Sequence, residues 1–464
     1  MPPVRDTAAV ERPKEAPSQA PAACSSGRGF AEAPLRWPLP ETDPDPLVGP
    51  RLVDMDGDGR QDLLVVHDAG DAAIGAARWR VHWNTGDGFA AGEAWSLPAI
   101  DGRGRLTATV LDRCDAGGAL QAAVRDVTAD GWVDLVVTRG CDEVADWRVY
   151  PGGEGGFGDE PAVWRAPRLG DPETTPGLAS GTASCSGGGD VPYVFVGLTS
   201  DGRPDLLTYR SCEAAGWRVW EGSEAGYQAA PVAWRAPSEL AGGRAVSHPA
   251  GEGSERIQNT CRWQQGASFL ADLTGSGRSD LWITDACDAE DVGTRRWLRF
   301  ENGGDGFAES PTDWSLPIPP RPDAFDLDRG ERGCIQAGVE RARENLLPET
   351  GWRYHLRDMT ADGRPDLVLT ERCGLAPDSW TVHPNTGGGF ADAGERWCLP
   401  EAALSDGPIT EPGPAQRRCE GGARPAYEVL ELTGDACPDL VLRGSCEEPE
   451  VGLTHWRVFP GVCG

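Results

Sequence analysis

A nine-residue motif that recurs six times constrains the fold of this chain more than any other feature. The copies begin at residues 54, 126, 197, 272, 358 and 431. Oxygen-bearing side chains fall at positions 1, 3, 5 and 9, and glycine usually stands at position 6. Each copy runs directly into an apolar segment, such as Leu-Leu-Val-Val at 63–66. We therefore predict that each copy is a loop that joins two β-strands.

The same motif predicts calcium binding. Short oxygen-bearing side chains at alternate positions converge on one hard cation, and glycine permits the sharp turn between them. The third copy has Gly197 at position 1, so we assign it no ligands, and the sixth has Ala436 at position 6. The candidate Ca²⁺ ligands are Asp54, Asp56, Asp58, Asp62, Asp126, Thr128, Asp130, Asp134, Asp272, Thr274, Ser276, Asp280, Asp358, Thr360, Asp362, Asp366, Glu431, Thr433, Asp435 and Asp439.

The spacing of the motif predicts the architecture. Successive copies start 72, 71, 75, 86 and 73 residues apart. Such a period, with all-β character, is typical of a propeller with one blade per repeat. Two further signatures keep the same period, a strand that ends in glycine and an aromatic residue, and Trp-x-x-Pro soon after it. We predict an all-β fold, a six-bladed β-propeller with about four antiparallel strands per blade.

The ends of the chain complete each other. The sixth repeat begins a strand at residues 456–461 and stops, and its missing half lies at residues 29–40. We predict that the N-terminal strand completes the C-terminal blade and so closes the ring. The expected blades are 41–98, 99–167, 168–237, 238–317, 318–400 and 401–464 with 24–40. Residues 1–23, rich in proline and alanine, are expected to form a flexible tail or linker.

These repeats resemble the FG-GAP and VCBS repeat families, whose fold is the propeller at the N-terminus of integrin α-subunits. The resemblance spans residues 24–464, and the first loop matches the family pattern at every ligand position. It implies that the aspartate-rich loop of each blade binds calcium. It also implies a single propeller domain.

The 14 cysteines follow the blades and predict disulfides. In blades two to six, one cysteine precedes the motif and one follows it. The expected pairs are Cys114–Cys141, Cys185–Cys212, Cys261–Cys287, Cys334–Cys373, Cys419–Cys446, a closing pair Cys24–Cys463 and, by elimination, Cys398–Cys437. Zinc binding is the alternative, but the chain has no Cys-x-x-Cys and its six histidines do not accompany the cysteines. Disulfides indicate an extracytoplasmic location, secreted or at the cell surface, although no signal peptide is visible.

Charge and hydropathy exclude several partners. The net charge is −30, with 73 acidic against 43 basic residues, and nucleic acid binding needs a basic surface. No run of 18 apolar residues exists, so we expect no membrane insertion. We expect a monomer whose binding surface lies on the inserts at 238–262, 318–350 and 401–425, or at the mouth of the central channel.

The sequence carries no known catalytic motif, which favours a binding protein over an enzyme. The leading hypothesis is a calcium-binding adhesion module for a protein or glycan ligand. The alternatives are a polysaccharide lyase or hydrolase on the same scaffold, and a scaffold module of an RHS or Tc-toxin-like assembly. Most of the 18 tryptophans sit at repeat positions, where we expect packing between blades. The candidates for exposed rings that suit sugars are Trp83, Trp132, Trp220, Trp263 and Trp282.

Overall fold

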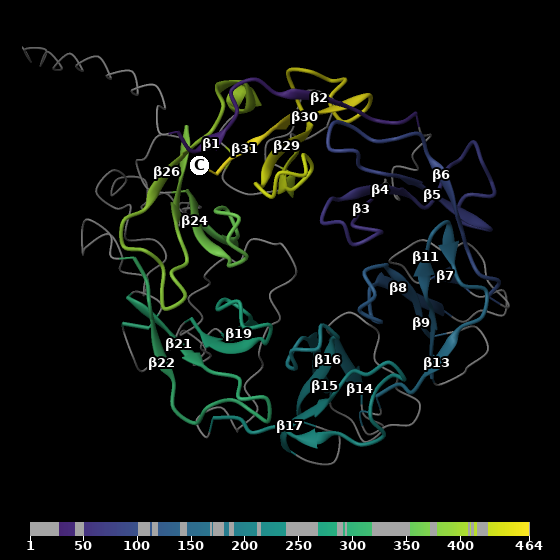
Figure 1. The fold of residues 1–464 in the computed structure, drawn as a ribbon, viewed down its shortest axis with the longest axis vertical. Helices are drawn as coiled ribbons and strands as arrows, with labels where there is room; N and C mark the ends of the chain where they lie inside the picture. The colour runs from purple at the N-terminus through teal and green to yellow at the C-terminus, as the bar shows by residue number, and fades with distance from the viewer. Residues whose placement is uncertain are drawn as a thin grey trace, which may run out of the picture.

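Six β-sheets are arranged around a common centre in the computed structural model (Figure 1). The structure describes residues 27–41, 51–100, 112–113, 119–139, 146–167, 169, 181–184, 190–210, 215–237, 268–284, 291–292, 295–317, 353–371, 378–406, 409, 413–414 and 426–463. The expected tail at 1–23 and most of the three inserts lie outside these ranges. The described part of the insert at 401–425 includes a 3₁₀ turn, η6 (Glu401–Asp406). The six-bladed, all-β prediction is confirmed.

Each blade has four antiparallel strands, with the motif loop between the first and the second. Blade 1 holds β3 (Arg51–Val53), β4 (Asp62–Val65), β5 (Arg78–His82) and β6 (Glu93–Ser96). Blade 2 holds β8 (Ala119–Arg125), β9 (Asp134–Arg139), β10 (Trp147–Tyr150) and β13 (Ala162–Trp164). Blade 3 holds β15 (Asp190–Val196), β16 (Asp205–Arg210), β17 (Ala215–Trp220) and β18 (Val232–Ala233).

The other three blades repeat this order. Blade 4 holds β19 (Ser268–Ala271), β20 (Asp280–Ile283), β21 (Arg296–Phe300) and β22 (Thr312–Ser315). Blade 5 holds β23 (Arg353–Arg357), β24 (Asp366–Glu371), β25 (Ser379–His383) and β26 (Glu395–Cys398). Blade 6 holds β28 (Ala426–Leu430), β29 (Asp439–Gly444), β30 (His455–Phe459) and β2 (Leu35–Pro38). Three short strands pair with the first strands of blades 2, 3 and 6, namely β7 (Asp112–Arg113), β14 (Gly181–Ser184) and β27 (Gly413–Pro414).

The two ends of the chain meet in blade 6, as the sequence predicts. Strand β2 pairs with β30 and places Trp37 opposite Trp456. Strand β1 (Gly29–Phe30) pairs with β31 (Gly461–Val462) and also runs parallel to β26 of blade 5. Figure 1 shows the C-terminus beside β1. The N-terminal segment therefore closes the ring with backbone hydrogen bonds to two blades.

The glycine–aromatic signature joins each blade to the one before it. In blade 2, strands β11 (Gly152–Gly153) and β12 (Gly156–Phe157) form a hairpin that pairs with β6 of blade 1. A Cβ atom at Gly156 would lie 2.6 Å from that of Ser96, so only glycine fits this approach. The ring of Phe157 then inserts between Trp79 and Trp95, with centroids 5.4 and 5.6 Å away.

Equivalent rings seal the other blade interfaces. Phe30, Phe89, Phe307 and Phe390 each contact two tryptophans of the preceding blade at centroid distances of 5.6–6.0 Å, and Tyr227 contacts Trp147 at 5.3 Å. Such edge-to-face pairs stabilise by about 0.5–1.5 kcal/mol beyond their buried area. The prediction that most tryptophans pack between blades agrees with these contacts. The prediction of exposed rings is wrong for Trp220 and Trp282, which are 1% and 0% exposed because they lie in the cores of blades 3 and 4. Trp263 lies outside the described residues.

Two disulfide predictions are wrong. Cys437 bonds to Cys463, so neither the pair Cys24–Cys463 nor the pair Cys398–Cys437 exists. The reason is that β31 runs beside the sixth loop, where a Cβ atom at Gly461 would lie 3.1 Å from that of Cys437. Cys398 and Cys446 are also disulfide-bonded, to partners outside the described residues. The other pairs involve residues outside the described part and stay predictions.

Candidate functional site

The six motif loops lie side by side on one face of the propeller, and we call them the loop ring (residues 54–62, 126–134, 197–205, 272–280, 358–366 and 431–439). Neighbouring loops touch through their backbones. A Cβ atom at Gly57 would lie 2.3 Å from the carbonyl oxygen of Gly131 in the next loop. The guanidinium of Arg203 donates to the carbonyl of Thr128 at 3.3 Å. The N–H of Ser279 donates to the carbonyl of Gly197 at 2.8 Å, Arg364 lies against Gly275 and Arg60 lies against Gly434. These contacts join all six loops into one continuous surface.

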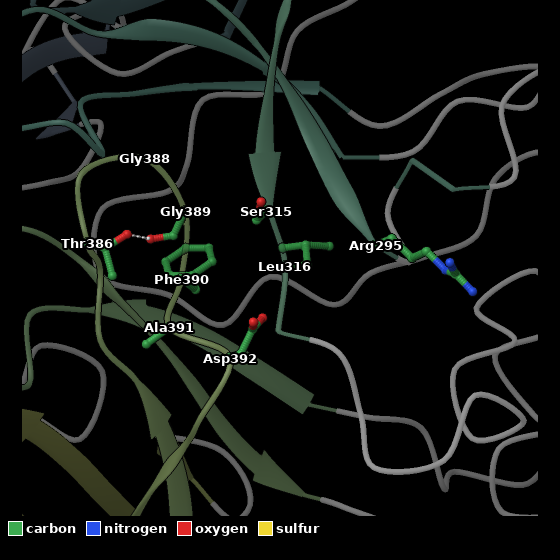
Figure 2. Close-up of a pocket in the computed structure, with 9 residues that line it drawn as sticks. All are labelled: Arg295, Ser315, Leu316, Thr386, Gly388, Gly389, Phe390, Ala391 and Asp392. Atoms are coloured by element: carbon green, nitrogen blue, oxygen red, sulfur yellow. Dashed lines mark hydrogen bonds between the residues drawn. The ribbon is translucent and has the colours of Figure 1, made fainter.

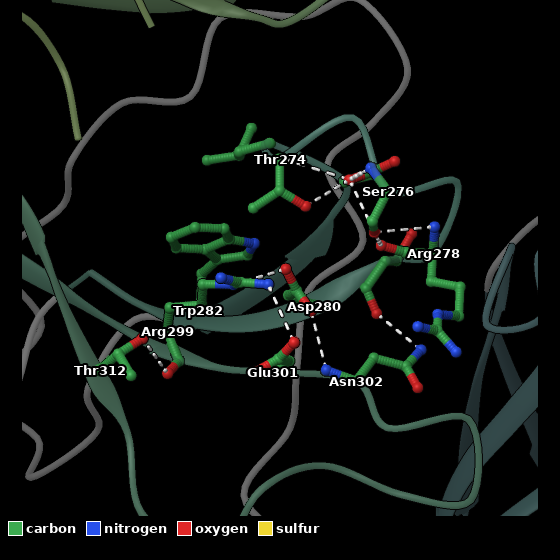
Figure 3. Close-up of polar contacts among 12 residues, drawn as sticks. Thr274, Ser276, Arg278, Asp280, Trp282, Arg299, Glu301, Asn302 and Thr312 are labelled. Atoms are coloured by element: carbon green, nitrogen blue, oxygen red, sulfur yellow. Dashed lines mark hydrogen bonds and ion pairs between the residues drawn. The ribbon is translucent and has the colours of Figure 1, made fainter. Parts of the chain in front are cut away.

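The aspartate at position 9 anchors each loop to its own blade. It is 0–2% exposed in all six loops. Its Oδ1 accepts the backbone N–H at the end of the third strand, at 2.7–3.1 Å. In five loops its Oδ2 accepts the N–H of loop position 2, at 2.9–3.0 Å. In the fourth loop, Oδ2 of Asp280 instead accepts Nε of Arg299 at 2.7 Å (Figure 3).

These contacts give position 9 a structural task. Both oxygens of each carboxylate already accept hydrogen bonds from protein groups, which is how a buried charge is retained. The candidates Asp62, Asp134, Asp280, Asp366 and Asp439 are thus placed beneath the loops as anchors. Burial raises the pKa of all six position-9 carboxyls, despite these hydrogen bonds, and that of Asp62 to about 6.

The side chain at position 1 shapes the turn. Asp54 accepts the N–H groups of Gly57 and Gly59 at 2.8 and 3.0 Å. Equivalent hydrogen bonds reach Asp126, Asp272, Asp358 and Glu431 in their own loops. At position 5, the carboxylate or hydroxyl accepts the N–H of position 7 in each loop, from Asp58, Asp130, Asp201, Ser276, Asp362 and Asp435. Positions 1 and 5 therefore point toward the same turn.

The first loop brings three carboxylates together. Oxygens of Asp54, Asp56 and Asp58 all lie within 4.8 Å of one another, and within the described residues no other group of three acidic, histidine or cysteine side chains does so. The other loops carry threonine at position 3. Hard oxygen donors at this separation suit Ca²⁺. Positions 1, 3 and 5 of the first loop thus fit the ion, and position 9 would support it from below.

Arginines at position 7 balance part of this charge. Arg60 pairs with Asp58, Arg364 with Asp362 at 2.6 Å, and Arg203 with Asp201 at 3.7 Å. A cation at position 5 competes with these pairs. Partly exposed ion pairs of this kind contribute little to stability, so a cation that displaced them would sacrifice little.

The two irregular loops differ in chemistry. In the third loop, the hydroxyl of Thr199 hydrogen-bonds Asp201 and Asp205 at 2.9 and 3.1 Å. In the sixth, burial and the neighbouring carboxylates raise the pKa of Glu431 to about 7. Calcium binding at Glu431 would have to displace this proton.

The sequence reasoning missed loop position 4 and the asparagine after the third strand. Position 4 has a left-handed backbone at Gly57, Ala129, Gly275, Ala361 and Gly434, with φ of 59–80°. The amides of Asn302 and Asn385 donate to the preceding blade's loop at 2.9 and 2.7 Å. The sequence signal for this left-handed position was that every loop carries glycine, alanine or serine at position 4.

A cavity of about 420 Å³ opens where blade 4 meets blade 5 (Figure 2). Its lining includes Leu316, Thr386, Phe390 and Asp392. Phe390 is the ring that seals this blade interface. Among the described residues, the lining of this cavity includes one acidic side chain, Asp392.

No family model matches the chain, and no curated protein matches its sequence. Among solved structures, it is similar to the Photorhabdus luminescens Tc holotoxin pore, with 14% identity and a TM-score of 0.48 over 93% of this chain and 15% of that chain. It is also similar to an Agrocybe aegerita lectin that recognises non-reducing terminal N-acetylglucosamine. That match has 14% sequence identity and a TM-score of 0.39, over 85% of this chain and 74% of the lectin chain. A crystal structure of TcdB2–TccC3 without its hypervariable C-terminal region has 12% sequence identity and a TM-score of 0.32, over 93% of this chain and 15% of that chain. The chain spans about 15% of the length of the toxin chains.

Proposed function

We propose that this chain is a calcium-binding β-propeller that works outside the cytoplasm as a non-catalytic binding module for a protein or glycan. The observation that carries the proposal is the convergence of Asp54, Asp56 and Asp58 within one loop of the loop ring. Calcium there would neutralise three carboxylates and fix the turn that joins β3 to β4. Ligand binding would then use the rigid face that the six loops build.

Two observations support the other parts of the proposal. The buried carboxylates of the loops are held by backbone N–H groups, so they serve the fold and are poorly placed for acid–base catalysis. The Cys437–Cys463 disulfide is typical of an oxidising compartment. The described residues contain no helix with the length and hydrophobicity needed to cross a membrane.

Calorimetric titration of the chelator-treated chain with CaCl₂ tests the metal. We expect at least one site with a dissociation constant of about 10⁻⁴–10⁻³ M or tighter, and a higher melting temperature with calcium. The matched variant is Asp56→Thr, which gives the first loop the position-3 residue of the other loops. It should weaken the tightest site. No binding heat and no change in melting temperature would overturn the proposal.

Incubation with soluble polysaccharides tests the absence of catalysis. We expect no new reducing ends and no unsaturated products, with or without calcium. Sustained product release by the purified chain, lost when the first loop is mutated, would support a lyase or hydrolase instead.

A further inference from the structure

Two tryptophans that break the repeat pattern come together at the interface of blades 1 and 2. Trp83 stands where the other blades carry Pro151, Glu221, Glu301, Pro384 and Pro460, and Trp132 stands at loop position 7, where four of the other loops carry arginine. Both contact the buried Trp95, at centroid distances of 5.9 and 6.0 Å. Both are only partly buried.

Sealing the blade interface does not require these two rings. Phe157 already inserts between Trp79 and Trp95, as the equivalent rings do elsewhere. The other interfaces with such a ring between two tryptophans close with a proline or glutamate at the position of Trp83. Trp83 and Trp132 are therefore additions to the common plan, placed on the face of the loop ring.

Trp83 and Trp132 contact the same buried ring, that of Trp95, and each is hydrogen-bonded to an exposed carboxylate residue. Trp132 is stacked on Trp95 with an interplanar angle of 28°, so one face of its ring is covered and the other is turned away. Trp83 meets Trp95 edge to face and donates its indole N–H to the exposed Glu93 at 3.1 Å. The exposed Asp130 accepts the backbone N–H of Trp132 at 2.9 Å.

We propose that Trp83 and Trp132, with Glu93 and Asp130, form a binding site for a neutral pyranose ring of a glycan. The flat C–H face of a sugar with equatorial hydroxyls stacks on an indole, and its hydroxyls donate to carboxylates at the edge. Acidic sugars are disfavoured, because the site is acidic and the chain carries a net charge of −30. This site rests on the proposed binding function and names its ligand class.

A cationic ligand is the competing class, because carboxylates and aromatic rings also attract ammonium groups. Enclosing such a group takes several ring faces around one point. Here Trp95 is 1% exposed and Trp132 has one face covered by it, so the described rings give a platform and not a cage. The geometry favours the sugar.

The test uses the full chain with calcium, titrated calorimetrically with cellotetraose and with chitotetraose as neutral probes. Oligogalacturonate, choline and a lysine-rich peptide serve as the acidic and cationic arms. We expect binding of at least one neutral probe. The variants Trp132→Arg and Trp83→Glu, which restore residues of the other repeats and so preserve the fold, should each weaken it at least about tenfold.

The control is Arg278→Ala, at position 7 of the fourth loop, which should bind the sugar like the wild-type chain. Calcium affinity, measured on the same samples, should be unchanged in Trp83→Glu and Arg278→Ala, whereas the arginine of Trp132→Arg can pair with Asp130 as Arg60 pairs with Asp58. Binding of choline or peptide alone, binding of no neutral probe, or equal affinity in the tryptophan variants would overturn the sugar site. If calcium binding persists in that case, the proposed function stands without it, whereas a chain that binds no calcium contradicts the proposed function itself.

Discussion

Three alanines in the loop ring adopt a backbone that favours glycine. Ala129, Ala361 and Ala436 have φ of 59–67°. A left-handed conformation costs a residue with a Cβ atom roughly 1–2 kcal/mol. Ala361→Gly and Ala436→Gly should therefore each raise the free energy of unfolding by about 0.5–1 kcal/mol. Urea denaturation checks this, with Ser200→Gly as the control, because position 4 of the third loop is not left-handed. If Ser200→Gly raised the free energy of unfolding as much as these two variants do, the alanines would not be strained.

The buried anchor at position 9 should contribute more to stability than the exposed candidate ligand at position 5. Asp134 accepts the N–H groups of Val127, Thr128 and Gly152. In Asp134→Asn, an NH₂ group replaces one carboxylate oxygen and faces these N–H donors. This should lower the free energy of unfolding by about 2–4 kcal/mol. Asp130→Asn in the same loop should cost less than about 1 kcal/mol in the absence of calcium. Equal melting temperatures of the two chelated variants would contradict the anchor role.

Protonation of the loops should stabilise the calcium-free chain. Burial raises the pKa of Asp62 to about 6 and that of Glu431 to about 7, from ordinary values of 3.8 and 4.5. The folded state then binds these protons more tightly than the unfolded chain, so its stability rises as the pH falls from 8 to 5. Calcium, which displaces the protons, should add less stability at pH 5 than at pH 8. Melting curves recorded between pH 5 and pH 8, with EDTA and with calcium, check both pH dependences. In Asp62→Asn, the melting temperature of the calcium-free chain should vary less with pH.

The same residues show what could be predicted at this scale. The period of the carboxylates predicted where the loops lie. It did not separate the candidate ligand positions 1, 3 and 5 from the anchor at position 9, because all four are oxygen-bearing side chains. That distinction depends on burial beneath the turn, which is a property of the folded blade. The same holds for Trp220 and Trp282, whose ring type suggests a surface role but whose strand positions face the core.

At the scale of elements, the hairpin glycines should be irreplaceable. A Cβ atom at Gly306 would lie 2.4 Å from that of Arg235, and its φ is 146°. Gly306→Ala should therefore destabilise the chain by about 2–4 kcal/mol, through overlap and backbone strain together. Gly388→Ala, in the equivalent hairpin of blade 5 but with open space around its Cα, is the matched control. Similar melting temperatures of the two variants would contradict the close approach.

Peptide mapping without reduction should find Cys437 linked to Cys463. Cys398 is bonded to a cysteine outside the described residues, and Cys24 is the one left once the five blade pairs are assigned. Gly29 pairs with Cys398, so we expect Cys24–Cys398 to tie the N-terminal segment to blade 5. The sequence could not predict the Cys437–Cys463 pair, since that pair depends on β31 lying beside the sixth loop. A free thiol at Cys398 would contradict the expectation.

At the scale of the molecule, closure should depend on residues 27–40. A chain that starts at residue 41 loses β2, leaves the edge of β30 unpaired and removes Phe30 from its contacts with Trp380 and Trp397. It should melt at a lower temperature and self-associate. A chain that starts at residue 24 should behave like the full chain. Sedimentation and melting curves compare the two, and a stable monomer lacking residues 1–40 would show that the ring closes without β2.

The pairing of β1 with β31 also decides how the molecule bears tension. Gly29 lies opposite Val462, and Phe30 opposite Gly461, in antiparallel register. Whatever precedes and follows these strands therefore emerges at nearly the same point. A pull between the two ends therefore loads this short pair together with the contact of β1 with β26 of blade 5 and the Cys437–Cys463 disulfide. A longer polypeptide can accordingly accept the whole ring as an insertion without moving its own flanking segments apart.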